Sequence, residues 1–294
     1  MLTTLQKAIA IDAIRINDNR KVVIKLVRTW TEELPIAQYL TSPPMMSDTR
    51  NRSVALLDVI MLPDDDEHVF IVMPMLLRFD ILPFRRVGEF AEAVHYFLQG
   101  LEFMHEHNIA HMDACLFNLM MDASKAIPKG FHFRNWWTHT GLDYKNFEFH
   151  ERWEVSPVQY YYIDFGLSYQ YPLGLKGMTE SGSCGQDASV PEFGSDDPYD
   201  PFKVDIYQLG NVILNVVNKY EGLDLFLEIG RTMTSKIPEE RPTASRALRQ
   251  FERLLSSLKP PDLKRRIWRV DVPLWDRFRI KHLRSISRIP LMVE

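Results

Sequence analysis

Residues 111–122 read HMDACLFNLMMD, and the rest of the chain is interpreted outward from this stretch. It places His111, Asp113 and Asn118 ahead of an apolar run, residues 119–121, which predicts a short buried strand. Asp113 could accept a proton from a hydroxyl group, and Asn118 could offer an amide oxygen to a divalent cation. Phosphoryl transfer requires both tasks of a protein, because the protein has to position a nucleophile and hold metal ions.

Further motifs stand on both sides of this stretch in a fixed order. They are residues 23–25 (VIK), 164–166 (DFG), 191–192 (PE), 205–210 (DIYQLG) and 241–244 (RPTA). In these motifs and their order the chain resembles the protein-kinase superfamily over roughly residues 8–258, with the character of its divergent fungal kinase-like members. The resemblance implies that residues 191–192 close an activation segment and that Glu192 pairs with Arg241.

The resemblance implies an α+β, bilobal protein-kinase-like fold. It divides the chain into a β-rich N-lobe (residues 1–75), a mainly helical C-lobe (residues 76–258) and a basic tail (residues 259–294). We expect the N-lobe to be reduced and to lack a first strand. Gly88 is the first glycine of the chain, so no glycine-rich loop precedes Lys25 to cover a nucleotide.

An insertion of about residues 124–156 separates Asn118 from Asp164, where kinases use far fewer residues. It is rich in aromatic side chains, namely Phe131, Phe133, Trp136, Trp137, Tyr144, Phe147, Phe149 and Trp153. We expect it to be ordered and to pack on the C-lobe. A ligand or partner site made of these rings is the alternative.

The resemblance also implies a catalytic constellation that uses ATP and Mg²⁺. Asp113 would orient a substrate hydroxyl, and Asn118 and Asp164 would hold Mg²⁺ on the nucleotide phosphates. Lys25 would hold the α- and β-phosphates and be positioned by an acidic residue. His111 would pack under the aromatic ring of the DFG motif rather than bind a metal ion.

Glu33 is the acidic residue expected to position Lys25. It falls in the first turn of a predicted helix over residues 31–40, because Pro35 is tolerated only near the start of a helix. Glu32 is its competitor for this contact. An acid at this position would also be favoured by the helix dipole alone.

The nucleotide base would lie against residues that follow the second strand of a predicted hairpin. By resemblance Met73 is the gatekeeper, and Met75 and Leu76 form the hinge that would hydrogen-bond adenine. Met120 is expected at the same nucleotide site. Pro74 lacks an N–H group, so the hinge depends on the N–H groups of its two neighbours.

Departures from the kinase pattern leave three functions open. Met112 stands where kinases carry the Arg that binds activation-loop phosphate, so any activity should not require phosphorylation of residues 167–190. Cys115 stands where Ser/Thr kinases carry a Lys that neutralises the transferring group. The functions are a protein kinase acting on Ser or Thr hydroxyls, a pseudokinase acting as a binding module, and a small-molecule phosphotransferase.

Composition limits the class of protein and the cellular compartment that we expect. The chain has 294 residues, 46% of them hydrophobic and 25% charged, which is ordinary for a globular protein. Cys115 and Cys184 are its only cysteines, so a disulfide framework is not expected and a reducing compartment is favoured. No stretch approaches the ~20 apolar residues of a membrane span, and no signal peptide is recognised. An intracellular protein, cytoplasmic or nuclear, with a protein substrate is expected.

Charge is unevenly distributed along the chain. Residues 259–294 carry ten Lys and Arg against four acids, so the tail is +6 within a net charge of −4. Such a tail could contact nucleic acid or an anionic membrane. The favoured interpretation is that it packs on the acidic body through Ile267, Trp268, Val270, Val272, Leu274, Trp275 and Phe278, so a nucleic-acid partner is not expected but stays open.

Periodicity and turn residues predict the remaining elements. Strands are expected over residues 8–16, 21–27, 54–61 and 69–75. Helices are expected over residues 87–107, 201–218, 223–233 and 243–258.

Overall fold

The protein is described by a computed structural model over residues 10–172, 179–182, 185–194, 197–275 and 277. The strands are β1 (Ala10–Arg15), β2 (Arg20–Arg28), β3 (Asp58–Leu62), β4 (Asp65–Pro74), β5 (Leu77–Arg78), β6 (Ile109–Ala110), β7 (Leu119–Met121), β8 (Tyr160–Tyr162), β9 (Tyr169–Gln170), β10 (Tyr220–Glu221) and β11 (Trp268–Arg269). The α-helices are α1 (Glu33–Thr41), α2 (Pro43–Met46), α3 (Val87–Glu106), α4 (Arg152–Val155), α5 (Pro201–Val217), α6 (Leu227–Met233), α7 (Ala244–Ser257) and α8 (Pro260–Lys264). The structure therefore mixes α and β elements with small sheets.

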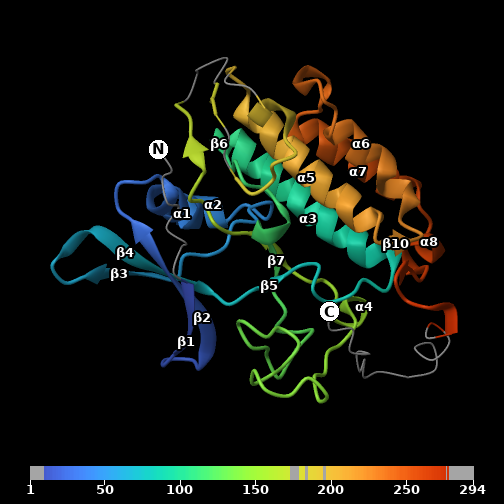
Figure 1. The fold of residues 1–294 in the computed structure, drawn as a ribbon, viewed down its shortest axis with the longest axis horizontal. Coiled ribbons are helices and arrows are strands. Elements are labelled where there is room, and N and C mark those ends of the chain that lie inside the picture. The colour runs from blue at the N-terminus through green and yellow to red at the C-terminus, as the bar shows by residue number, and fades with distance from the viewer. Residues whose placement is uncertain (1–9, 173–178, 183–184, 195–196, 276, 278–294) are drawn as a thin grey trace.

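The largest sheet of the described residues has the strand order β1-β2-β4-β3 and is antiparallel throughout. In β2, Lys25 lies opposite Ala10 of β1 and Ile71 of β4, which places it well inside the sheet. Val27 packs with Val69 and Ile71 in a small apolar cluster. Figure 1 shows this sheet on one side of the molecule, with α1 beside it and the long helices on the other side.

The predicted strand over residues 54–61 begins later than expected, at Asp58. The preceding segment turns to a different sheet, because Val54 N donates to Tyr162 O at 2.9 Å and Ser53 forms a parallel bridge with Tyr162. The hairpin turn is also shorter than predicted, since β4 already begins at Asp65. Residues 53–54 therefore connect the large sheet to β8.

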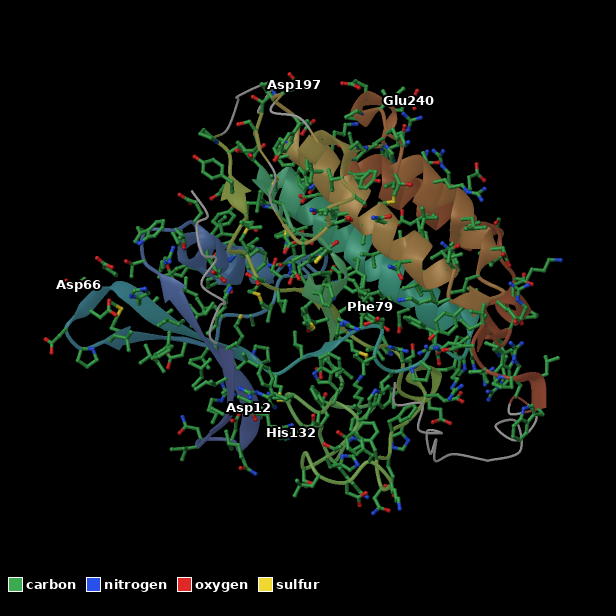
Figure 2. The ribbon with its side chains drawn as sticks, viewed as in Figure 1. Asp12, Asp66, Phe79, His132, Asp197 and Glu240 are labelled. Atoms are coloured by element: carbon green, nitrogen blue, oxygen red, sulfur yellow. The ribbon has the colours of Figure 1, made fainter. Side chains whose placement is uncertain are left out.

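The helical part is built around α3, whose predicted bounds are confirmed to within one residue. It packs against α5 and α7, as Figure 1 shows. Phe90 contacts Phe84 and Phe226 edge to face, and the ring of Phe251 stacks on Phe226. Each such buried aromatic side chain contributes about 2–3 kcal/mol to folding. Figure 2 places Phe79, which is 1% exposed, in the interior between the sheet and the helices.

The predicted helix over residues 201–218 is confirmed as α5 and lies close to α6. A Cβ atom on Gly210 would come within 2.6 Å of Met233 Cβ, so the close approach of these helices requires glycine there. In place of the single helix predicted over residues 223–233, the structure has a 3₁₀ turn followed by α6. The helix predicted over residues 243–258 is confirmed as α7, and Thr243 caps its N-terminus.

The insertion is ordered without regular structure except for α4. Trp137 packs edge to face with Phe147, and Lys21 Nζ of β2 donates to Phe131 O at 2.6 Å. His132 marks the insertion in Figure 2. Phe131, Phe147 and Phe149 belong to the main hydrophobic core, which also contains the buried faces of α3 and α5. The expectation that the insertion is ordered and packs on the rest of the fold is therefore confirmed, although Trp136 stays exposed.

The described part of the tail packs on the body as expected, but through fewer apolar residues. Ile267 is 1% exposed, and Arg277 forms an ion pair with Glu221. Leu274 and Trp275 are 71% and 66% exposed, so their expected docking is wrong. Residues 276 and 278–294, which carry Phe278 and four of the ten Lys and Arg residues of the tail, lie outside the described residues, as do residues 1–9. Of the described helices, none has the length and apolar character needed to span a membrane.

Candidate active site

Lys25 lies between two carboxylates that come from distant segments. Its Nζ donates to Glu33 Oε1 at 2.5 Å and to Asp164 Oδ1 at 2.8 Å. Glu33 is the first residue of α1 and is 6% exposed, and Pro35 follows in the first turn, as predicted. Glu32 is the N-cap residue, so the contact belongs to Glu33 and not to its competitor.

The pKa values of these groups follow from their burial and mutual charges. Burial lowers the pKa of the Lys25 ammonium, but the charges of Glu33 and Asp164 outweigh burial, and the pKa is raised. Burial acts to raise the pKa of Asp164, and Lys25 outweighs it, so that pKa lies below its ordinary value. Burial and the neighbouring Asp164 raise the pKa of Glu33 against the opposing effect of Lys25. A cation is therefore held at the centre of the group.

The antiparallel pairing of β7 with β8 brings Asn118 and Asp164 to the same end of a small sheet. Leu119 of β7 pairs with Tyr162 of β8, and Ile163 N donates to Asn118 O at 3.1 Å. Asn118 directly precedes β7, and Asp164 lies two residues beyond β8. The backbone of Asp164 has a positive φ of 65°, an uncommon conformation for a residue other than glycine.

Asp113 is 5% exposed, and its carboxylate accepts hydrogen bonds from Asn118 and Gln186. Asn118 Nδ2 donates to Asp113 Oδ2 at 2.8 Å, Gln186 Nε2 donates to the same oxygen at 3.1 Å, and Gln186 N donates to Oδ1 at 2.8 Å. Gly185 fits against this carboxylate, because a Cβ atom there would lie 2.9 Å from Asp113 Oδ1 and its φ is 83°. Residues 185–186 therefore cover the predicted base.

Asp205 of α5 holds the 111–113 loop by hydrogen bonds to its backbone. Its buried carboxylate accepts from His111 N at 2.8 Å, from Met112 N at 2.7 Å and from His105 Nε2 at 2.9 Å. Gln208, one turn further along α5, accepts from Ala114 N at 2.8 Å. These bonds hold Met112 at a φ of 65°, a strained conformation for a bulky residue.

His111 is fully buried and contacts Phe165, with ring centroids 5.4 Å apart. Its Nε2 lies 3.1 Å from Ile163 O. The imidazole ring of His111 therefore joins the 111–113 loop to the segment that follows β8. The expectation that His111 packs under the DFG aromatic ring is confirmed.

The residues predicted to hold adenine do not share one hollow, because Met75 and Leu76 line a larger cleft whose lining includes neither Lys25 nor Asp164. Met73 lines a small hollow together with Glu33 and Asp164. Met75 N donates to Lys21 O at 3.3 Å, so this N–H group is already used and the expectation that it is available to a base is not met. Leu76 and Met120 are half-buried, and their contact with a nucleotide stays a prediction.

The buried ion pair implied by the resemblance is confirmed. Arg241 Nη1 and Nη2 donate to the two carboxylate oxygens of Glu192 at 2.6 and 2.8 Å. The Arg241 side chain is 0% exposed and that of Glu192 is 8% exposed. This bidentate pair fixes residues 191–192 to the segment before α7.

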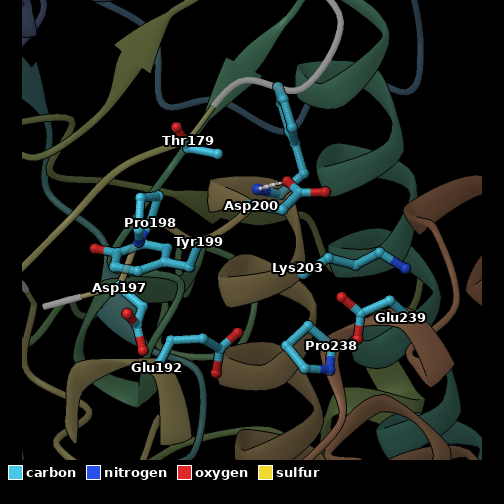
Figure 3. Close-up of a pocket in the computed structure, with 10 residues that line it drawn as sticks. Thr179, Glu192, Asp197, Pro198, Tyr199, Asp200, Lys203, Pro238 and Glu239 are labelled. Atoms are coloured by element: carbon cyan, nitrogen blue, oxygen red, sulfur yellow. Dashed lines mark hydrogen bonds between the residues drawn. The ribbon is translucent and has the colours of Figure 1, made fainter. Parts of the chain in front are cut away.

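A second hollow, of about 490 Å³, lies beside this ion pair (Figure 3). Glu192, Asp197, Asp200, Glu239 and Lys203 are among the side chains around it. Its lining includes neither Lys25 nor Asp164. The hollow is therefore separate from the candidate active site.

Asn118 and Asp164 suit Mg²⁺ better than a metal ion that needs a closed protein shell. Asn118 Nδ2 is bonded to Asp113, which leaves Asn118 Oδ1 to face a cation. Among the described residues, no group of three or more His, Cys, Asp or Glu side chains is placed to hold a metal ion. Mg²⁺ commonly takes only one or two carboxylates and completes its shell with phosphate and water.

Comparison with models of known protein families and with curated proteins finds no match for this chain. The functional argument therefore depends on the geometry of these residues.

Two residues of the site were missed by sequence reasoning. Gln186 lies in a glycine- and serine-rich stretch without periodicity, so no local pattern marks it as a partner of Asp113. Gln208 had a usable signal, because it stands three residues after Asp205 on one face of an otherwise apolar helix. Buried polar residues at this spacing indicate that the helix holds another part of the chain.

Proposed function

We propose that this chain is a divergent, bilobal member of the protein-kinase superfamily. We propose further that it transfers the γ-phosphate of ATP, bound with Mg²⁺, to a Ser or Thr hydroxyl of a protein substrate. The observation that carries the proposal is the contact of Lys25 with both Glu33 and Asp164. The Lys25 ammonium, held between the two carboxylates, is suited to bind phosphate oxygens. The Asp164 carboxylate and Asn118 would hold the Mg²⁺ ion.

Asp113 supports the transfer step in this proposal. Its carboxylate would accept the proton of the substrate hydroxyl, and its bond to Asn118 fixes the orientation of both side chains. ATP and Mg²⁺ supply the phosphoryl group and neutralise its charge when bound. Lys25 orients the phosphates, and Gln186 limits access to Asp113.

Met112 supports activity without activation-segment phosphorylation. It is 4% exposed and packs with Tyr171 and Val190 in an apolar cluster. An apolar contact thus stands where an Arg would receive phosphate. Phosphatase treatment should leave activity unchanged, and a loss of activity would contradict this part of the proposal.

The alternative is a pseudokinase that binds a nucleotide or a partner without transfer. Cys115 favours it, because burial raises the pKa of its thiol to about 12 and the group stays neutral. A neutral thiol cannot replace the cation that Ser/Thr kinases place there. Loss of such a charge weakens transition-state stabilisation by about 3 kcal/mol.

The experiment separates nucleotide binding from transfer. Thermal unfolding of the purified chain is measured with ATP, with and without Mg²⁺, for wild type, Asp164→Asn, Lys25→Met and Asp113→Asn. Transfer of labelled γ-phosphate to a mixed protein substrate is measured in parallel.

We expect a Mg²⁺-dependent stabilisation in wild type that Asp164→Asn and Lys25→Met lose. Asp113→Asn should keep the stabilisation and lose transfer, because it retains the shape of the side chain but not its basicity. Stabilisation without transfer in wild type would favour the pseudokinase. No stabilisation by ATP at millimolar concentration would contradict both functions.

A further inference from the structure

Arg52 lies in the connection between α2 and β3, where neutral groups hold its guanidinium. The guanidinium carbon is 3.9 Å from the centroid of the Tyr96 ring. Nη1 donates to Gln159 Oε1 at 2.9 Å, and Nη2 reaches Gln99 Oε1 only at 3.5 Å. The Arg52 segment packs closely against α3, because a Cβ atom on Gly100 of α3 would lie 2.6 Å from Arg52 Cβ.

Arg52 has no carboxylate partner among the residues that the structure describes. Arg50 differs, because it forms ion pairs with Asp48 and Glu106, both at 2.8 Å. Burial lowers the pKa of the Arg52 guanidinium. A half-buried charge without a counter-charge costs folding free energy, so its retention calls for a compensating partner.

Arg52 lines a cleft of about 940 Å³ between the start of β2, the segment that follows β4, and the insertion. Arg20 and Lys21 add two more cations to its wall. Ser53 also lines the cleft, is 5% exposed, and its Oγ has no hydrogen-bond partner among the described residues. The apolar part of the wall includes Val54, Met75, Leu76 and Phe131.

The cleft wall carries more positive than negative side chains, because only Asp48 and Asp122 oppose its three cations. Asp48 lines the cleft but is paired with Arg50. Asp122 also lines it, and its Oδ1 accepts from Ser124 N at 2.8 Å. Arg52 is an ion-pair partner of neither. A cleft of this size with apolar walls and a few convergent polar groups is typical of small-molecule sites.

We propose that this cleft binds a small organic phosphate. The phosphate group lies on the free N–H groups of Arg52, and an apolar or aromatic body packs against Val54 and Phe131. A guanidinium suits this task, because its planar N–H groups match phosphate oxygens in pairs. Met75 and Leu76 of the predicted hinge line this cleft, but none of the residues proposed to handle phosphate, metal ion or proton does. The phosphate site at Arg52 is therefore separate from the proposed phosphotransfer centre.

The test uses phenyl phosphate, inorganic phosphate and benzyl alcohol as probes, without Mg²⁺ and in EDTA. Thermal unfolding and isothermal titration are measured against sodium chloride of equal ionic strength. The variants are Arg52→Gln, which removes the charge, and Arg52→Lys, which keeps the charge but loses the planar fork. Arg269→Gln is the control for loss of a paired Arg, because neither Arg269 nor its partner Asp271 lines the cleft.

Phenyl phosphate should stabilise wild type more than inorganic phosphate does, and benzyl alcohol should have no effect. Arg52→Gln should bind phenyl phosphate at least about tenfold more weakly, which is about 1.4 kcal/mol, with Arg52→Lys in between. Without a probe, Arg52→Gln should unfold at the same temperature as wild type or higher, because an unpaired charge is removed. Arg269→Gln should bind phenyl phosphate like wild type.

Three results would overturn the proposal. The first is no stabilisation of wild type at about 10 mM phenyl phosphate. The second is equal binding by wild type and Arg52→Gln. The third is a clear loss of stability in Arg52→Gln without a probe, which would show that Arg52 serves the fold through Tyr96 alone.

Discussion

Lys25 and Asp164 are 139 residues apart in the chain, yet Lys25 Nζ donates to Asp164 Oδ1 at 2.8 Å. The same ammonium contacts Glu33, so one side chain of the large sheet connects α1 with the segment after β8. Three separately predicted motifs thus meet at one cation.

The Lys25 and Glu33 pair should contribute strongly to stability, because their side chains are only 10% and 8% exposed. Lys25→Met should lower the free energy of unfolding by about 3 kcal/mol, since it leaves Glu33 buried without a counter-charge. The double variant Lys25→Met/Glu33→Leu should regain most of that loss. Urea denaturation measures both, and a loss below about 1 kcal/mol in the single variant would show that the pair is not effectively buried.

Asp205 should matter more for the 111–113 loop than for the helix that carries it. Asp205→Ala leaves the N–H groups of His111 and Met112 without acceptors and should cost about 3–5 kcal/mol. Asp205→Asn keeps one acceptor oxygen and should cost less. Urea denaturation of the two variants gives the comparison, and equal losses would show that the carboxylate bonds are not what stabilises the loop.

The lowered pKa of Asp164 gives its contribution to stability a defined pH range. A carboxyl whose pKa is lower in the folded protein stabilises the fold above its ordinary value of 3.8, and this stabilisation is lost as pH falls through the folded pKa. The difference in unfolding midpoint between wild type and Asp164→Asn should therefore be constant between about pH 7 and pH 5 and shrink below about pH 4. Guanidinium denaturation at several pH values measures it. A difference that already fades near pH 6 would place the pKa above its ordinary value.

Cys115 should resist alkylation in the folded protein. It is 5% exposed, and burial together with the charge of Asp113 raises the pKa of its thiol to about 12, so little thiolate forms at pH 8. Peptide mapping after iodoacetamide treatment should find Cys115 unmodified under native conditions and modified in urea. Rapid native labelling would contradict the buried position of the residue.

Much of the fold follows from local patterns. Residues 87–107 show apolar side chains at helical spacing, and α3 spans Val87–Glu106. Pro35 limits where α1 can begin, so Glu33 falls in its first turn. The strand over residues 119–121 is also as predicted. These features depend on residues close together in the chain, which is why periodicity and proline placement predict them.

Other features required the folded chain. The predicted strand over residues 54–61 begins late, because Val54 bonds to Tyr162, more than a hundred residues away. Leu274 and Trp275 are apolar but exposed, since composition alone does not say which side of a segment finds a partner. The contact of Gln186 with Asp113 joins an aperiodic segment to the central loop.

By itself the sequence determined which residues can carry the chemistry and the order in which they occur. It also determined the helices and strands that present them, because these depend on spacing and on near neighbours. Only the tertiary structure decided that Lys25 meets both Glu33 and Asp164, that Gln186 covers Asp113, and that Arg52 lines a cleft but has no carboxylate partner among the described residues. Such contacts join positions far apart in the chain, and burial and charge pairing are settled only when those positions are packed together.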